Sequence, residues 1–276
     1  MASLLAEPVG RAARPAPRFL RPYRYFAFRY SRTWRGTLTT SILYPILYLV
    51  AMGIGLGHLV DTHLASHGAL RRIDGVSYVD FIAPGLIVST AMQWGTNESM
   101  WPVMAGLKWL KTYHALLATP IEVVDLVHGH LAWIATRVAA SSAIFLAVLA
   151  AFGDLRSALA LFAIPVAMLT GLAFAAPIAA FTATQENDAL LPLVYRMCIV
   201  PLFLFSGTFF PISLLPGWVQ VVARVTPLYH SVALARALML GHTDPLDALG
   251  HCLYLLALLG LGTSAARRSF TRRLVL

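Results

Sequence analysis

The sequence predicts an all-α integral membrane protein with six transmembrane helices. Of its 276 residues, 58% are hydrophobic and only 12% are charged, and the mean hydropathy is +0.71. This balance is too apolar for an ordinary soluble domain. Several apolar runs are long enough to cross the ~30 Å hydrocarbon core of a bilayer. The basic residues flank these runs instead of gathering on one soluble face, which favours contact with membrane lipid over binding of nucleic acid.

The first 36 residues are predicted to form a cytoplasmic tail followed by an amphipathic helix. They contain eight arginines and no apolar core, which does not fit a cleavable signal peptide. Residues 1–17 are rich in Arg, Ala and Pro and predict a disordered tail. Phe19–Trp34 mixes aromatic residues with arginines, a composition typical of an interfacial elbow helix in the headgroup region. Residues 37–276 are expected to form one transmembrane domain.

Six apolar runs follow, and each is assigned as a membrane span. They are Leu38–Val60, Tyr78–Trp101, Val124–Phe152, Ser157–Ala183, Leu190–Pro211 and Leu246–Ala265. The fourth span carries small residues at every fourth position, which lets another helix approach closely. Before the last span, Ile212–Val225 is apolar but too short to cross, and Pro216 and Gly217 interrupt it. This stretch is predicted to form a re-entrant extracellular hairpin, whose backbone the rest of the protein must cover.

The distribution of basic residues orients the predicted spans. With both termini inside, the cytoplasmic segments hold 14 basic residues and the external segments hold 5. The positive-inside rule therefore predicts a multi-pass protein of the cytoplasmic (inner) membrane with its N-terminus and C-terminus inside. The connection between the second and third spans then lies in the cytoplasm. It contains Lys108 and Lys111, the only lysines of the chain.

That cytoplasmic connection, Lys108–Pro120, is basic, aromatic and amphipathic. A short helix in this position could receive force from a soluble partner. An interfacial linker that only joins two spans explains the same composition. Composition alone leaves both interpretations open.

Two sets of polar side chains lie within the predicted spans. Thr90, Gln93 and Asn97 follow helical spacing on the second span and form one stripe that faces protein or water. They are candidates for the substrate path, although hydrogen bonding between helices explains the stripe equally well. On the third span, His130 and Arg137 share one face. Because a buried arginine costs about 2.5–3.5 kcal/mol on insertion scales, Arg137 is expected to have a partner or a wet cavity.

The motifs of several enzyme and carrier classes are missing from the sequence. It has no Walker A pattern, no Gly-x-Ser-x-Gly elbow and no His-Glu-x-x-His pair, so we expect neither ATP hydrolysis nor a metal site in this chain. Cys198 and Cys252 show no metal-binding or paired spacing. His130 with Arg137 would suit a lipid phosphate in an intramembrane enzyme, but no nucleophile accompanies them. The acidic residues lie at span ends or in loops, unlike those of ion-coupled carriers.

Two blocks of the sequence resemble the type-2 ABC transporter permeases. The blocks are Tyr78–Leu86 with Ala91, Met92, Glu98, Leu117–Pro120, Asp125, Gly129 and Trp133, and then Phe203–Pro211. From about residue 20 to the C-terminus, the chain is similar to permeases that export nodulation lipo-oligosaccharides, with the daunorubicin-resistance permeases as near relatives. Where that branch usually has Gly-Glu before the tryptophan of the third span, this chain has Gly129-His130. The departure weakens the transfer of a carboxylate role to this position.

The resemblance implies a permease that pairs with a second copy of itself and with two copies of a separate ATP-binding subunit. ATP and Mg²⁺ would be held by that partner, and this chain would bind no cofactor. The cytoplasmic connection looks like the coupling helix that docks on the ATPase. The candidate coupling residues are Lys108, Trp109, Lys111, Leu117, Thr119, Pro120 and Glu98. The hairpin looks like a cap over the exit, with a candidate extracellular gate of Phe205, Phe209, Phe210 and Pro211. Plain packing of these aromatic side chains is the alternative.

The function expected from these features is that of a permease subunit in an ATP-driven ABC exporter. The substrate would be lipid-like or amphipathic, such as a lipo-oligosaccharide, a glycolipid or a hydrophobic drug, and would move from the cytoplasmic side outward. The candidate substrate path consists of Thr90, Gln93, Asn97, His130 and Arg137. A non-transporting membrane scaffold or channel-like subunit of a complex is the alternative, because a fold does not by itself establish transport.

Overall fold

The computed structural model describes residues 17–32, 34–35, 43, 46–47, 50–51, 76–152, 157–241 and 244–275. Within these ranges every secondary-structure element is a helix, in agreement with the predicted all-α class. The predicted tail and the predicted first span, Leu38–Val60, lie almost entirely outside the described residues. The count of six spans is therefore untested.

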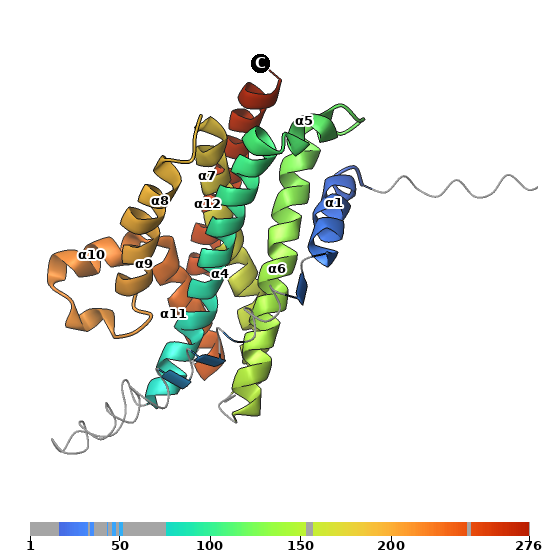
Figure 1. The fold of residues 1–276 in the computed structure, drawn as a ribbon. Coiled ribbons are helices and arrows are strands. Elements are labelled where there is room, and N and C mark those ends of the chain that lie inside the picture. The colour runs from blue at the N-terminus through green and yellow to red at the C-terminus, as the bar shows by residue number, and fades with distance from the viewer. Residues whose placement is uncertain are drawn as a thin grey trace, which may run out of the picture.

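Four long helices form a bundle with α7 at its centre (Figure 1). They are α4 (Tyr78–Met104), α6 (Val123–Ala151), α7 (Ala163–Thr184) and α12 (Pro245–Leu274). α7 contacts the other three, and a short 3-10 turn, η3 (Ala158–Phe162), precedes it. These helices correspond to the second, third, fourth and last predicted spans. α12 differs from its prediction in length, because it continues through the C-terminal arginines well beyond Ala265.

Small residues bring α4 and α7 into close contact. The alanines at every fourth position of α7 are all buried: Ala163, Ala167, Ala175 and Ala179. A Cβ atom added at Gly95 of α4 would lie 2.1 Å from the carbonyl oxygen of Gly171 on α7. Only a hydrogen atom fits at that point. The close approach predicted from the small residues of the fourth span is therefore confirmed.

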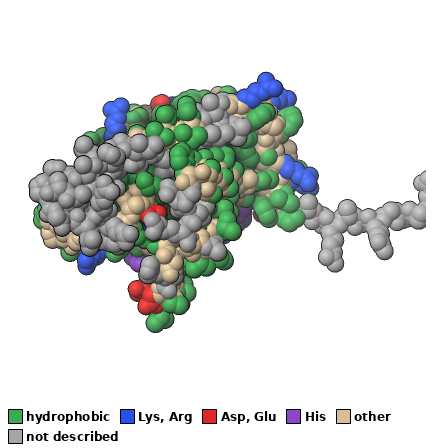
Figure 2. All heavy atoms as spheres, turned by 90° about the horizontal axis from the view of Figure 1, so that it is seen from below, with side chains coloured by type: hydrophobic (Ala, Val, Ile, Leu, Met, Phe, Trp, Pro, Cys, Tyr) green, Lys and Arg blue, Asp and Glu red, His purple; other side chains and the backbone are tan. Residues whose placement is uncertain are grey.

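Three of the described helices are long and apolar enough to cross a membrane. They are Val123–Ala151, Leu159–Thr184 and Pro245–Leu274. α4 is nearly as long but carries more polar residues, and the apolar run Leu190–Phe205 is shorter. Seen along the bundle from the end opposite the C-terminus, the described surface is largely hydrophobic, with Lys and Arg at a few separate places (Figure 2). Length and composition both support a membrane protein.

The chain between α7 and α12 is broken into short helices. They are α8 (Leu190–Val194), the π-helical turn η4 (Tyr195–Ile199), α9 (Val200–Phe205), the 3-10 turn η5 (Ile212–Leu214), α10 (Gly217–Val225) and α11 (Pro227–Leu240). The helix of the predicted fifth span ends at Phe205, before Pro211, because the chain turns at Gly207 with φ +84°. α11 was not predicted, although it packs against α4, α7 and α12.

The two segments predicted at the cytoplasmic surface are both helical. α1 (Leu20–Ser31) lies within the predicted elbow and packs against α6. It buries Pro22 and Phe26. The predicted Lys108–Pro120 connection contains the end of a π-helical turn, η2 (Ala105–Trp109), and a six-residue helix, α5 (Thr112–Leu117). α5 and the C-terminus lie at the same end of the bundle (Figure 1).

Candidate functional site

A charged pair joins α4 to α6 toward the end of the bundle that carries α5. Arg137 of α6 and the carboxylate of Glu98 on α4 form an ion pair, and their side chains are only 12% and 14% exposed. The guanidinium of Arg137 lies 4.9 Å from the centre of the Tyr30 ring and 4.4 Å from that of Trp94, within cation–π range. The expected partner of Arg137 is therefore present. It is Glu98, for which the sequence suggested only a coupling role.

His130 of α6 is buried beside this pair. Its Nε2 atom lies 3.1 Å from the backbone carbonyl oxygen of Glu98. A carbonyl oxygen can only accept, so Nε2 carries the proton of the imidazole. The Nδ1 atom can then accept from the hydroxyl of Tyr113, 3.5 Å away. The ring of Phe26 from α1 packs edge-on, 4.9 Å from the imidazole, so side chains or backbone of α1, α4 and α5 all contact His130.

Tyr113 anchors α5 to the bundle. Its side chain is 1% exposed, and its ring lies 6.3 Å from Phe26 of α1 and 5.9 Å from Phe270 of α12. A Cβ atom at Gly106 would lie 2.6 Å from this ring, so only glycine leaves room for it. Burial raises the pKa of the Tyr113 phenol, so the hydroxyl keeps its proton as a donor. We name the following residues the buried junction: Glu98, Tyr113, His130 and Arg137.

The outer side of the α5 region exposes apolar and basic side chains together. Trp109 is 52% exposed and Leu110 is 57% exposed, and Lys111 is exposed next to them. Lys111 adopts a left-handed backbone conformation, with φ 50°, where the chain turns from η2 into α5. Lys108 differs from Lys111, because its Nζ atom donates to the carbonyl oxygen of Glu186 at 2.8 Å. One of the two lysines therefore has a partner within the chain, in the loop between α7 and α8.

The remaining predicted coupling residues lie where α5 leads into α6. Leu117 is half-buried, and Thr119 and Pro120 are exposed. Arg21 of α1 donates to the carbonyl oxygen of Pro120 at 3.5 Å. An exposed ion pair of 2.7 Å joins Arg18 to Glu122 in the same region. The predicted elbow and the predicted coupling segment are thus in contact.

α1 approaches α6 closely at Gly129, the residue of the resemblance motif that precedes His130. A Cβ atom at Gly129 would lie 2.6 Å from Cγ of Pro22 and 2.7 Å from the carbonyl oxygen of Phe19. Glycine is needed here because the backbone of α1 occupies the space of a side chain.

The polar stripe of α4 is separate from the cavity beside the buried junction. Thr90, Gln93 and Asn97 are half-buried, and the Asn97 amide donates to the carbonyl oxygen of Gln93 at 2.9 Å. A cavity of about 280 Å³ next to Arg137 is lined by residues of α1, α4 and α6, including Trp94, but by none of the stripe residues. The structure therefore brings His130 and Arg137 of the predicted path together and leaves the stripe elsewhere on α4.

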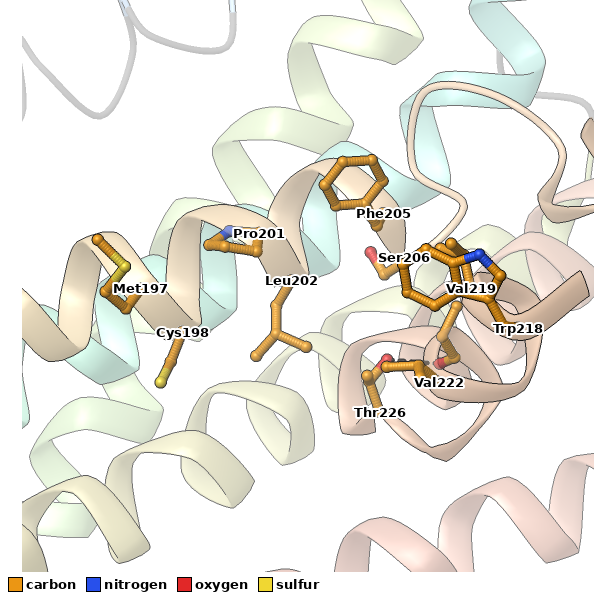
Figure 3. A pocket seen from close by; sticks show the side chains of 11 residues that line it. Met197, Cys198, Pro201, Leu202, Phe205, Ser206, Trp218, Val219, Val222 and Thr226 are labelled. Carbon is orange, nitrogen blue, oxygen red and sulfur yellow. Dashed lines mark hydrogen bonds between the residues drawn. The ribbon is translucent and has the colours of Figure 1, made fainter. Parts of the chain in front are cut away.

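Phe205 is the one predicted gate residue that lines the apolar pocket between η4–α9 and α10. This pocket has a volume of about 530 Å³. Phe205 lies on one side of it and Trp218 and Val222 of α10 lie on the other (Figure 3). The other gate candidates are half-buried and do not line this pocket: Phe209, Phe210 and Pro211. The four predicted gate residues therefore do not line one common pocket.

Arg236 of α11 holds the turn after α9 against α4, a role that the sequence analysis missed. Its Nη2 atom donates to the carbonyl oxygens of Phe81, at 3.1 Å, and Gly207, at 2.9 Å. The guanidinium also lies 3.9 Å from the centre of the Phe81 ring. A buried hydrogen bond of 3.0 Å between Ser89 and Thr208 fixes the same turn. The available signal was an arginine among the apolar residues 232–240.

The chain is similar to known membrane transport proteins over most of its length. The ABC-2 type transporter family matches residues 23–240. Nodulation protein J of Rhizobium meliloti (strain 1021) is 34% identical over 244 residues, covering 85% of this chain and 88% of that protein. Nodulation protein J of Rhizobium leguminosarum bv. trifolii is 34% identical over 247 residues, covering 87% and 90%. The inner membrane transport permease YadH of Escherichia coli (strain K12) is 23% identical over 231 residues, covering 78% and 80%.

The matched stretch includes most of α1, the whole buried junction and α11. The family and its relatives indicate a transport subunit rather than an ATPase. On the extent of this match and the identity to its relatives, the chain belongs to the ABC-2 type transporter family.

Proposed function

We propose that this chain is the permease subunit of an ATP-driven exporter in the inner membrane, with both termini on the cytoplasmic side. Two copies of the chain pair with two copies of a separate ATP-binding subunit, which holds ATP and Mg²⁺. The substrate is lipid-like or amphipathic and moves outward. A lipo-oligosaccharide, a glycolipid and a hydrophobic drug fit this class, because each needs a path that accepts polar and apolar groups.

The observation that carries the proposal is the two-sided arrangement of the α5 region. Its inner side inserts Tyr113 among α1, α6 and α12. Its outer side exposes Trp109, Leu110 and Lys111. An exposed tryptophan beside other exposed apolar surface is typical of sites that dock another protein, and Lys111 adds a charge that can steer an acidic partner. Because the Tyr113 ring is closely packed, a push on the outer side would move the buried junction and not only a loop.

Force on α5 would reach the long helices through the buried junction. Tyr113 contacts His130, the Nε2 atom of His130 is bound to the carbonyl oxygen of Glu98, and the Glu98 side chain pairs with Arg137. Closure of the ATP-binding subunits would therefore shift α4 and α6 together. Bundle motions of this kind open and close a path for substrate.

The residues proposed for the substrate path and the gate are not supported equally by their positions in the structure. The pocket between α9 and α10 supports a role for Phe205 near the exit. Nothing in the contacts of Thr90, Gln93 and Asn97 favours substrate over a neighbouring helix, and their lining role stays a prediction. The same holds for Phe209, Phe210 and Pro211 as parts of a gate.

The coupling role is tested on the complex reconstituted with its ATP-binding subunit in proteoliposomes. We expect Lys108→Glu combined with Lys111→Glu to separate ATP hydrolysis from export while the chain stays folded. The Lys108 substitution also removes a hydrogen bond within the chain, to the carbonyl oxygen of Glu186. Lys111→Glu and Trp109→Ala, made singly, therefore test the outer surface of the α5 region alone. Each should weaken binding of the ATP-binding subunit by about tenfold, the effect of losing one docking contact of ~1.4 kcal/mol, and should lower the transport per ATP hydrolysed.

Arg224→Glu is the matched control, because Arg224 is exposed on α10, far along the chain from α5. It should leave coupling unchanged. The substrate class is found by screening a lipo-oligosaccharide, a glycolipid and a hydrophobic drug for stimulation of ATP hydrolysis. Unchanged substrate-stimulated ATPase activity and transport in the Lys111 and Trp109 variants would remove the coupling assignment.

A further inference from the structure

We propose that a cavity between α12 and α6 binds the phosphate group of an anionic phospholipid. The cavity lies toward the end of the bundle that carries α5 and the C-terminus, and its volume is about 500 Å³. Its lining comprises Val124, Ser264, Arg267, Arg268, Thr271 and Arg272. Three guanidiniums thus share one cavity, and no Asp or Glu lines it. The inference rests on α12 as a membrane span and not on the proposed export function.

Helical spacing places the polar groups in two rows along the cavity. Ser264, Arg268 and Arg272 are four residues apart and form one row, and Arg267 and Thr271 form the next. The Ser264 and Thr271 hydroxyls donate to backbone carbonyl oxygens one turn earlier, at 2.9 and 2.8 Å. Their oxygens can still accept a hydrogen bond, while the guanidiniums supply several donors. The cavity therefore suits a ligand with an anionic phosphate and a headgroup hydroxyl.

The arginines of this cavity have no acidic partner among the residues that the structure describes. The ion pairs seen between described residues are Arg18–Glu122 and Arg137–Glu98, and neither involves an arginine of the cavity. The acidic residues at the start of α6 are engaged in its capping box. The three arginines are exposed, so their mutual repulsion is modest and is screened by salt, and an anion between them relieves it. The dipole of α12 acts only within its last turn, which contains Arg272 but neither Arg267 nor Arg268.

The position of the cavity along α12 favours a lipid over a soluble anion. α12 has 30 residues, about 45 Å of helix against ~30 Å of hydrocarbon. Its apolar stretch gives way to arginines at Arg267, the level expected for headgroups. Leu261 lies one turn before Ser264 and is 72% exposed, which gives acyl chains an apolar surface next to the cavity. Basic pockets between spans at this level are known to bind anionic headgroups, and a single guanidinium can bind a phosphate through two parallel hydrogen bonds.

The test uses the full chain, purified in a neutral detergent and titrated with phosphatidylglycerol, phosphatidylcholine or inorganic phosphate. The measurement is the midpoint of thermal unfolding. We expect phosphatidylglycerol alone to raise the midpoint. The variant Arg268→Gln with Arg272→Gln should need roughly 25-fold more phosphatidylglycerol for the same rise, about fivefold for each arginine near a membrane surface.

Two further variants keep the outcome interpretable. Arg24→Gln with Arg273→Gln removes the same charge from exposed positions outside the cavity and should respond like the unmodified chain. Arg268→Lys with Arg272→Lys retains the charge and should keep most of the response, which separates lost binding from lost folding. An equal response to phosphatidylcholine, a full response to millimolar inorganic phosphate, or an undiminished response in the glutamine variant would overturn the lipid site. The lipid site would also be overturned if the glutamine variant no longer co-purified with the ATP-binding subunit but still responded to phosphatidylglycerol. That result would indicate that the arginines bind a protein partner.

Discussion

The buried junction and the short helices from Leu190 to Val225 differ in which side chains they bury. The junction covers charged groups, and the short helices leave apolar side chains exposed. In the junction, Glu98 and Arg137 are paired and nearly covered, and His130 is bound through both ring nitrogens. In the short helices, large apolar side chains lie open, with Trp218 74% exposed and an apolar pocket beside it. The first region buries its polar groups, whereas the second leaves apolar surface exposed in the part of the chain that the structure describes.

We infer from this difference that the two regions have different roles. A closely packed and paired region transmits displacement, because its side chains cannot move independently. An exposed apolar region needs lipid, a second copy of the chain or substrate to cover it. Substitutions in the junction should therefore lower the stability of the single chain, and substitutions between α9 and α10 should change what the chain binds.

The largest effect is expected from breaking the ion pair of the junction. Glu98→Ala or Arg137→Ala leaves a buried charge without its partner, which costs about 3–5 kcal/mol of unfolding free energy. The double variant should lose less than the sum of the two, since no unpaired charge remains. Folding yield and thermal unfolding in detergent measure this, with the exposed Arg224→Ala as control. Normal expression and export by Arg137→Ala would show that this charge is merely tolerated.

The contact between α4 and α7 should be nearly as sensitive. Gly95→Ala places a methyl group within the space of the Gly171 backbone, and the helices must separate at a cost of about 1–3 kcal/mol. Gly250→Ala is the matched control, because its Cβ would meet no atom within 4 Å and alanine favours a helix by about 0.5–1 kcal/mol. The two variants should shift the unfolding temperature in opposite directions. Equal shifts would mean that the two helices are not closely packed.

Removal of the Tyr113 hydroxyl should have a moderate effect that separates coupling from packing. Tyr113→Phe keeps the ring among Phe26 and Phe270 but loses the hydrogen bond to His130, worth about 0.5–1.5 kcal/mol. ATP hydrolysis by the complex should persist while transport per ATP falls. If Tyr113→Phe behaves like the unmodified chain and Tyr113→Ala does not, the ring alone connects α5 to the junction.

The smallest effect on stability is expected in the exposed region. Trp218→Ser should change the unfolding free energy of the single chain by less than ~0.5 kcal/mol, as for most surface substitutions. Transport should nevertheless decrease, because the pocket between α9 and α10 loses one wall. Unfolding and transport are measured on the same preparation. A strongly destabilised variant with intact transport per folded molecule would contradict the contrast between the two regions.

Hydropathy was sufficient to predict the long helices, and it failed where tertiary contacts decide the structure. The spans that became α6, α7 and α12 are continuous apolar runs. The prediction that Arg137 needs a partner followed from the cost of a buried charge, but nothing in the sequence linked it to Glu98, 39 residues away. Tyr113 lies in the basic, aromatic connection, and nothing in the sequence distinguishes it from the exposed residues around it.

α11 escaped prediction because its apolar residues are mixed with His230, Ser231 and Arg236, so that no continuous run marks it. Its helix is favoured by Pro227 at the first position and ended by Gly241 in a left-handed conformation, a pattern of weak local signals. The contacts of Arg236 with Phe81 and Gly207 join residues far apart in the chain. Such pairings become visible only when the fold is known.

The central claim is that the α5 region faces the cytoplasm, where a soluble ATP-binding subunit can reach it. The most direct test is labelling by a membrane-impermeant maleimide in a chain whose Cys198 and Cys252 are replaced by alanine. A cysteine at Trp109→Cys should react only after the membrane is opened. One at Leu246→Cys, an exposed position in the first turn of α12, should react in intact spheroplasts, because the other end of this 30-residue helix is the one expected in the cytoplasm. Reaction of Trp109→Cys in intact spheroplasts would contradict the claim.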